Sequence, residues 1–410
     1  MLSGMATVYF ALTASIALIS FSEIKLAALS CRLVRSVWDP VDDVVTFSIM
    51  SGIIVNMVNN KTPQEESLSE RWWRSHCFEA RADNLVHRAQ SLKRLRAFFD
   101  TRGYVEVETP ALQISPGLEP NLLAFHTSIR KIDGTAQPLY LHTSPEFTMK
   151  KLLAAGMRKI YQVSHVFRDG EWSAKHHPEF TLLEWYSVGM NWRELANEAI
   201  DLISNVCGSH ARHAGHICAL DRPWEFISVQ EAFERATGID LLATTPEPWE
   251  PSTELLRVAA ESIGIRIADS DTWDDLFFRI FLEHVEPKLG CEVPTVLHSY
   301  PTSLAALSRV SKQDPRVAER FEIFICGLEL ANGYGELIDA KEQRRRFVKM
   351  AEQRREQGRD PYPIDESFIG ALEAGIPECS GIAIGFDRLV MLATGAEQIE
   401  DVLWAPVVTN

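Results

Sequence analysis

The chain has 410 residues, of which 46% are hydrophobic and 24% are charged, a balance typical of a globular protein with a sizeable core. Lys and Arg number 41 against 56 Asp and Glu, so the formal net charge is −15, which argues against a broad nucleic-acid-binding surface. Seven scattered cysteines without a C-x-x-C pair argue against a disulfide framework or a zinc ribbon and favour a cytoplasmic location.

The N-terminal region differs from the rest of the chain. Residues 1–60 share no pattern with residues 61–410 and are predicted to form an extension outside the folded domain, with a start near Met50 or Met57 as one explanation. No basic residue precedes Lys25, so the charged region of a signal peptide is missing. A membrane anchor over residues 1–20 is the alternative interpretation, although no membrane association is expected. Residues 61–82 are predicted to be a boundary.

Periodicity predicts the elements of a domain that covers residues 83–408. A helix is predicted from Arg81 to Gly103, followed by a short strand in YVEVETP that Pro110 ends. Further strands are predicted at 139–143, 160–167, 178–188, 294–301 and 319–331, helices at 145–155, 191–207, 228–236, 252–263, 272–284, 339–356 and 365–374, and a strand-to-helix passage at 379–394. Strands dominate both ends and helices fill an insertion at 208–300, so we expect an α+β fold whose antiparallel sheet is flanked by helices.

The stretch FRDGEWSAKHHPEFTLLEWY (167–186) carries charged, imidazole and aromatic side chains together. If residues 160–168 and 178–186 pair as a hairpin, alternation puts Phe180, Leu182, Glu184 and Tyr186 on one face. Arg168 would lie where the partner strand ends, beside a histidine pair and an aromatic ring. A guanidinium that grips a phosphate and a ring that stacks on a base would suit a nucleotide. A salt-bridged hairpin without a ligand is the alternative.

A second stretch, GLELANGYGELIDA (327–340), brings Glu329, Glu336 and Asp339 together with Asn332. Carboxylates near a phosphate site suit Mg²⁺, which takes oxygen ligands, and they also suit a substrate ammonium group. A turn with solvated acidic residues is the alternative.

A third stretch, CSGIAIGFDRLVML (379–392), combines a strand of small residues with Arg388 at the start of an apolar helix. Small residues let a ligand approach the backbone, and an arginine at a helix N-terminus favours an anion. Close packing of the strand on the helix would explain the same pattern.

Two other stretches are weaker candidates. HARHAGHIC (210–218) contains three histidines and Cys218, and we expect a loop of exposed histidines rather than a zinc site. The basic run at 341–359 is expected to be a solvated helix face rather than a nucleic-acid contact.

In this order, the stretches resemble the motifs of class II aminoacyl-tRNA synthetases. GYVEVETP resembles motif 1, FRDGE with HHPEF resembles motif 2, and GIAIGFDRL resembles motif 3. The finer resemblance is to the lysine branch, through TSPEFTMKKLL, HPEFTLLEWY, ELANGYGEL and SGIAIGFDRLVML, and it spans about residues 83–405. Within that branch the chain resembles the truncated paralogues that attach (R)-β-lysine to elongation factor P. Too few residues precede motif 1 for an OB-fold anticodon domain, and Ala383 stands where the synthetases carry glycine.

The resemblance implies a homodimer with Pro110 at its interface, Mg²⁺-ATP as co-substrate, and activation of (R)-β-lysine or lysine as an adenylate. It implies elongation factor P as the acceptor, with tRNA not expected; a stand-alone lysyl-tRNA synthetase and an inactive sensing dimer are the alternatives. The implied amino-acid site comprises Ser144, Pro145, Glu146, Tyr186, Asn332, Glu336 and Ala383. The implied ATP site comprises Arg168, Asp169, Gly170, Glu171, His176, His177, Phe180, Glu329, Leu330, Gly385 and Arg388. Arg168, Glu329 and Arg388 are the implied catalytic residues, and Glu329 is the implied magnesium ligand.

One position departs from the family pattern. Arg-x-Glu is usual in motif 2, whereas here Gly170 occupies the glutamate position and Glu171 comes next. Either Glu171 reaches the adenine through a shifted loop, or a backbone group at Asp169–Gly170 meets it. The first arrangement is the favoured expectation.

Overall fold

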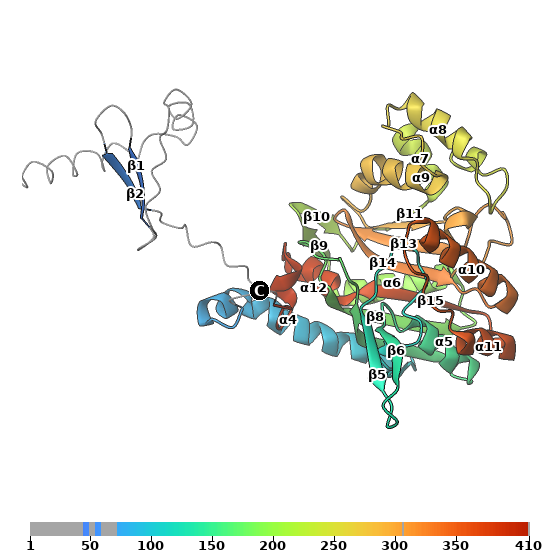
Figure 1. The fold of residues 1–410 in the computed structure, drawn as a ribbon, viewed down its shortest axis with the longest axis horizontal. Helices are drawn as coiled ribbons and strands as arrows, with labels where there is room; N and C mark the ends of the chain where they lie inside the picture. The colour runs from blue at the N-terminus through green and yellow to red at the C-terminus, as the bar shows by residue number, and fades with distance from the viewer. Residues whose placement is uncertain (1–43, 49–53, 59–71, 306, 409–410) are drawn as a thin grey trace, which may run out of the picture. The chain divides into compact units, whose positions relative to one another are not determined.

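The computed structural model describes residues 44–48, 54–58, 72–305 and 307–408 (Figure 1). Contacts divide the chain into two units, Met1–Ser67 and Leu68–Asn410. In the first unit, β1 (Val44–Ser48) and β2 (Ile54–Val58) form an antiparallel pair. The expectations for residues 1–43, including the alternative of an anchor, lie outside the described residues.

The second unit is built around an eight-stranded sheet in the order β11-β12-β13-β14-β15-β8-β7-β3. Its strands are β3 (Val105–Glu106), β7 (Lys159–Phe167), β8 (Glu179–Val188), β11 (Glu225–Ser228), β12 (Thr295–His298), β13 (Arg320–Ile325), β14 (Leu328–Gly335) and β15 (Cys379–Gly385). Only the outer pairs β11–β12 and β3–β7 are parallel, and every pair between them is antiparallel. The predicted fold class is therefore confirmed.

Smaller sheets and the helices complete this unit. The strands β4 (Leu112–Gln113), β5 (His126–Arg130) and β6 (Ala136–Leu141) form a three-stranded sheet, and β9 (His210–His213) pairs with β10 (His216–Ala219). The helices are α4 (Ser75–Asp100), α5 (Glu146–Ala154), α6 (Trp192–Cys207), α7 (Val229–Thr237), α8 (Thr253–Ser262), α9 (Trp273–Ile280), α10 (Ala340–Glu356), α11 (Glu366–Gly375) and α12 (Phe386–Thr394).

The two faces of the sheet carry different layers. On one face, Leu183 and Trp185 of β8 pack with α4, α6 and α12 in the main core. On the other face, Tyr186 of the same strand joins a second core formed with α5, α10 and α11. Because side chains alternate along a strand, β8 supplies the main core with one set of residues and the opposite layer with the other.

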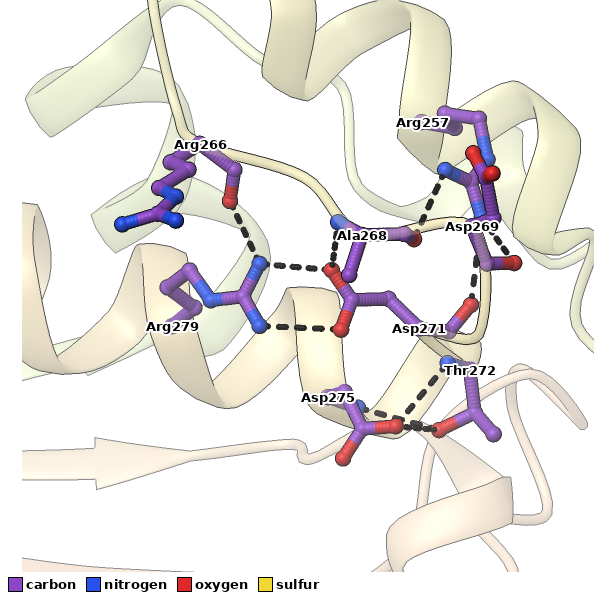
Figure 2. Close-up of polar contacts among 8 residues, drawn as sticks. All are labelled: Arg257, Arg266, Ala268, Asp269, Asp271, Thr272, Asp275 and Arg279. Carbon is purple, nitrogen blue, oxygen red and sulfur yellow. Dashed lines mark hydrogen bonds and ion pairs between the residues drawn. The ribbon is translucent and has the colours of Figure 1, made fainter.

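The insertion between α6 and β13 has its own apolar core, to which α7, α8 and α9 contribute (Figure 1). Figure 2 shows how the start of α9 is fixed: both Asp271 carboxylate oxygens bind the Arg279 guanidinium, at 2.6 and 2.9 Å, and one also accepts from the Ala268 N–H at 2.7 Å. Thr272 and Asp275 form a capping box, which satisfies N–H groups that a helix leaves free at its first turn. The insertion is not purely helical, because β9 to β12 also fall within 208–300.

Two predictions about local structure are wrong. The single strand predicted at 319–331 is two strands, because Cys326 and Gly327 both adopt positive φ (52° and 70°) and turn the chain between Ile325 and Leu328. The loop predicted at 210–218 is the β9–β10 hairpin, whose turn again has two positive φ values, as a two-residue hairpin turn of type I′ requires. Among the described residues, no group of three or more His, Cys, Asp or Glu could hold a metal.

The basic run at 341–359 lies largely on α10. Arg344 pairs with Glu366, and Arg345 pairs with Glu342. Arg354 is buried, and its guanidinium donates to the carbonyls of Pro120 and Leu122. Part of this charge therefore serves the fold rather than an external partner. In the described part of the chain, no helix has the length and apolarity that crossing a membrane requires.

Candidate active site

A cavity of about 450 Å³ lies over β8, β14 and β15. Phe180, Leu182, Glu184 and Tyr186 all line it, so the predicted alternation of β8 is confirmed. All but three of the residues that the family resemblance implies for the amino-acid and ATP sites also line this cavity. The exceptions are Pro145, Asp169 and Gly170.

One end of the cavity is acidic. We call Glu146, Glu184 and Glu336, which line it together, the acidic end. Lys150 is fully buried behind them, and its ammonium nitrogen lies 2.5 Å from a carboxylate oxygen of Glu146 and 2.5 Å from one of Glu336. Burial lowers the pKa of Lys150, but the two carboxylates more than offset this and keep that pKa above its ordinary value. Two of the three carboxylates thus share one fixed cation.

Glu184 is held by neighbours on the cavity floor. The Ser144 hydroxyl donates to one of its oxygens at 2.6 Å, and the Tyr186 hydroxyl donates to the other at 3.1 Å. Burial, followed by the charge of Glu146, raises the pKa of Glu184 to about 8. Burial also raises the pKa of Glu336 to about 7, against the charge of Lys150. A ligand that brings positive charge would favour the ionised form of both groups.

Gly381 allows the floor to close around this end. A Cβ at this position would clash with the Tyr186 ring and would lie 2.5 Å from Glu336 Oε1. The residue must therefore be glycine for both side chains to keep their places. Ala383 lies two residues further along β15, on the same face, and lines the cavity with its methyl group.

The opposite end of the cavity is basic. We call Arg168 and Arg388 the arginine end. The Arg388 guanidinium donates to the backbone carbonyls of Glu329 at 2.8 Å and Lys175 at 3.2 Å, and burial lowers its pKa. The Arg168 guanidinium carbon lies 5.1 Å from the centroid of the Phe180 ring, and its Nη1 lies 3.8 Å from Glu171 Oε1. Neither arginine has a short carboxylate partner in the described chain, as suits an anion site.

The turn after Arg168 bears on the departure from the motif 2 pattern. Gly170 has a φ of +77°, a left-handed conformation that favours glycine over glutamate. The preceding residue, Asp169, donates its N–H to the Leu123 carbonyl at 2.9 Å. Glu171 lines the cavity, whereas Asp169 and Gly170 do not. The structure thus gives Glu171 access to the cavity, and its contact with adenine stays a prediction.

The two adjacent histidines have different surroundings. Both ring nitrogens of the buried His177 are engaged, one with the Glu179 carbonyl and the other with the Val407 N–H at 3.1 Å. Among the described residues, the His176 ring is bound only through Nδ1, to the Ser173 hydroxyl at 2.7 Å. Burial, followed by the charge of Arg388, lowers the pKa of His176 to about 4. His176 is therefore the one with a ring nitrogen left for a ligand.

The comparison with known families agrees with this geometry. Residues 63–409 match the family described as tRNA synthetases class II (D, K and N). The chain belongs to this class II synthetase family. Its antiparallel sheet is the platform that carries the cavity.

Individual relatives are more specific. Proteins named elongation factor P–(R)-β-lysine ligase are 43% identical in Proteus mirabilis, 42% in Photorhabdus laumondii and 41% in Salmonella paratyphi B. The Proteus alignment covers 79% of this chain and 95% of the relative, and the other two cover 78% and 94%.

Glu329 is a carboxylate suited to Mg²⁺ at the arginine end of the class II site. Glu329 lines the cavity there and forms no ion pair with any described residue. Since Mg²⁺ is usually bound by one or two carboxylates together with phosphate oxygens, Glu329 fits a metal shared with a nucleotide. The metal would neutralise phosphate charge when bound.

Asn332 lies beside a buried polar network. Glu322 accepts from Tyr300 at 2.5 Å, from Arg320 at 2.7 Å and from the Asn332 side chain at 3.5 Å. The Asn332 carbonyl oxygen has no hydrogen-bond partner among the described residues. Because the network orients the amide from behind, this oxygen is left to accept from a ligand in the cavity.

Sequence reasoning missed several residues of this class II site. Lys150 was not singled out, although its spacing of four from Glu146 is a readable helix signal. Glu184 was placed on the correct face without a role. Glu119 lines the cavity from the loop before β5, and no motif pointed to it.

Proposed function

We propose that this chain activates (R)-β-lysine with ATP as an aminoacyl-adenylate and transfers it to a lysine ε-amine of elongation factor P. The observation that carries the proposal is the polarity of one cavity, with carboxylates at one end and two arginines at the other. The names of the relatives at 41–43% identity supply the substrate and the acceptor.

The acidic end suits a diamino acid. With all groups ionised, Glu146, Glu184 and Glu336 together with Lys150 carry a net charge of −2, which matches the two ammonium groups of β-lysine. In the proposed complex, Ser144 and Glu146 hold one amino group, and Pro145 joins them in the chain. Tyr186, Asn332, Glu336 and Ala383 surround the rest of the amino acid.

The arginine end suits the triphosphate. In the proposal Arg168 binds the α-phosphate, Arg388 the γ-phosphate, and Phe180 stacks on the adenine. Glu329 binds Mg²⁺. The remaining contacts with ATP are assigned to Asp169, Gly170 and Glu171 in the motif 2 turn, and to His176, His177, Leu330 and Gly385.

The proposed reaction needs no covalent enzyme intermediate. A carboxylate oxygen of the amino acid attacks the α-phosphorus, the bond to the bridging oxygen breaks, and pyrophosphate leaves. Alignment of the two reactants can contribute roughly 7–11 kcal/mol. Arg168 and Arg388 are in place before the reaction, so they stabilise the developing phosphate charge without reorganisation.

The acceptor amine then attacks the activated carbonyl carbon, and AMP leaves. We further infer that residues 83–408 carry this activity and that the chain acts as a homodimer. A cytoplasmic location is part of the same proposal, since the six described cysteines are free thiols.

Pyrophosphate exchange tests the first step. Purified protein with ATP, Mg²⁺ and (R)-β-lysine should exchange labelled pyrophosphate into ATP, with L-lysine as the comparison substrate. Absence of exchange with every lysine isomer would favour an inactive sensing dimer. Addition of elongation factor P or lysine tRNA identifies the acceptor, and labelling of tRNA alone would indicate a stand-alone synthetase.

A further inference from the structure

The loop before β5 joins the two ends of the cavity. A Cβ on Gly117 would lie 2.8 Å from the Thr143 hydroxyl oxygen and 3.0 Å from Glu119 Oε2. Thr143 directly precedes the serine that binds Glu184. Further along the loop, the Leu123 carbonyl accepts from the Asp169 N–H, next to the motif 2 arginine. Glu119 is therefore held between the acidic end and the arginine end, where an amino-acid carboxyl group would meet an α-phosphate.

Contacts from behind fix this loop. The Arg354 guanidinium donates to the Pro120 and Leu122 carbonyls at 3.0 and 3.1 Å. The Tyr362 hydroxyl accepts from the Ala124 N–H at 2.9 Å. These bonds hold the loop backbone directly after Glu119, so its side chain has a defined position.

The Glu119 carboxylate is left without a counterion. In the described part of the chain, no residue forms an ion pair with it. Burial and the charge of Glu146 raise its pKa, against the charges of Arg168 and Lys150. Tyr334 is the other ionisable neighbour. A carboxylate without a counterion, whose pKa is raised, is a better proton acceptor than an ordinary carboxylate.

The negative charge of Glu119 is in excess of what the amino acid needs for charge balance. The acidic end already balances two ammonium groups, so Glu119 adds one negative charge that the amino acid does not need. The transfer step brings in a third cation, the ε-ammonium of the acceptor lysine. That group has a solution pKa of about 10.4 and must lose a proton before it attacks.

We propose that Glu119 binds the ε-ammonium of the acceptor lysine and accepts its proton during transfer. The neutral nitrogen forms a bond to the carbonyl carbon of the adenylate, and the bond from that carbon to the phosphate oxygen breaks. The nitrogen loses its second proton to the departing phosphate as the amide forms. The proposal rests on the proposed function.

The variant Glu119→Gln separates the two half-reactions. Pyrophosphate exchange and the KM for (R)-β-lysine in exchange should stay within about twofold of wild type, because adenylation does not involve this proton. Transfer to elongation factor P in a single turnover should slow by about 10²-fold or more. Retained exchange also shows that the variant is folded. Glu352→Gln, a change of the same kind at an exposed carboxylate of α10, is the matched control and should leave both steps unchanged.

Hydroxylamine gives an independent readout. It is already neutral at pH 7, so its attack on the adenylate needs no prior loss of a proton. Glu119→Gln should therefore form the hydroxamate at the wild-type rate while its transfer to elongation factor P is slow. The variant's transfer rate should also keep rising toward the pKa of lysine, whereas the wild-type rate should level off once Glu119 is ionised.

Four outcomes would overturn the proposal: unchanged transfer, a raised KM for (R)-β-lysine, parallel loss of hydroxamate, or a transfer profile with the wild-type pH dependence. Failure of the proposed function is a different result, since wild-type protein would then show no exchange with any lysine isomer.

Discussion

Individual residues give the cavity one acidic and one basic end. Repulsion between like charges at each end is unfavourable until a ligand of opposite charge binds. Arg168 lowers the pKa of Arg388, although burial is the larger cause. At the other end, Glu146 raises the pKa of Glu184, again after burial. Both ends therefore hold like charges near one another, which is unfavourable until an opposite charge enters.

The acidic end predicts a pH dependence of substrate binding. Because the pKa values of Glu184 and Glu336 are raised to about 8 and about 7, both groups gain protons as the pH falls from about 8.5 to about 6. A protonated carboxyl group loses its attraction for an ammonium group, so the KM for (R)-β-lysine should rise by up to about tenfold per pH unit. Pyrophosphate exchange at varied pH measures this. A KM for the amino acid that stays flat while the KM for ATP changes would contradict it.

The arginine end predicts the effect of removing one guanidinium. Arg388→Ala should lower the exchange rate by about 10²–10³-fold, since a preorganised donor to the phosphates is lost. The arginine gives up two hydrogen bonds to the Glu329 and Lys175 carbonyls and no ion pair among the described residues, so the fold should survive. Arg345→Ala, on the surface of α10, is the control. Exchange at the wild-type rate in Arg388→Ala would reject the assigned role.

At the residue scale, the positions of side chains within one motif could be predicted from the sequence. Contacts between side chains from distant segments of the chain could not. Phe180, Glu184 and Arg168 can be placed from alternation in one hairpin. Lys150 acquires its role only when β14 places Glu336 against α5. Glu119 acquires its role because the loop before β5 is fixed by α10, and no local pattern encodes that contact.

At the scale of elements, turns decide where prediction fails. The hydrophobic pattern continues across Cys326 and therefore predicts one strand at 319–331. A turn that begins at a cysteine with positive φ has no sequence signature as clear as Asn-Gly. The histidine hairpin was hidden for a similar reason, since its turn begins at Ala214. Long amphipathic helices were predictable because their period continues over several turns.

The start of α9 offers a test at this scale. The Asp271 carboxylate binds Arg279 and the Ala268 N–H (Figure 2), and the hydrogen bond with Arg279, the leading cause, lowers its pKa to about 2. A lowered carboxyl pKa stabilises the folded state above the unfolded value of about 3.9 and less as the pH falls toward about 2. Asp271→Asn should lower the melting temperature at pH 7 by roughly 1–2 °C, the shift expected for a loss of about 1 kcal/mol in a unit of this size.

Thermal unfolding across pH checks this expectation. The difference between wild type and Asp271→Asn should be constant from about pH 8 to about 5 and should narrow below about pH 4. Asp269→Asn, whose side chain forms no hydrogen bond or ion pair with another described residue, is the control. A difference that widened on acidification would contradict the assigned ion pair.

At the scale of the whole molecule, several of the exposed apolar side chains lie on the first elements of the second unit. Val86 on α4, Val105 on β3, Leu112 on β4 and Ile114 just after it are between 46% and 54% exposed. The short strand β3 ends the eight-stranded sheet, and an uncovered sheet edge invites pairing with another chain. Exposed apolar side chains along consecutive elements suit the homodimer that we propose.

The dimer can be tested by placing a charge in that surface. Light scattering should give a mass of twice 46.2 kDa for the wild type. Val105→Glu should raise the dimer dissociation constant by about 30-fold or more, because a desolvated carboxylate at an interface costs about 2 kcal/mol or more. Val348→Glu, at a similarly exposed valine of α10, should leave the dimer intact, since α10 lies on a different layer. A wild-type monomer, or equal dissociation of both variants, would place the interface elsewhere or remove it.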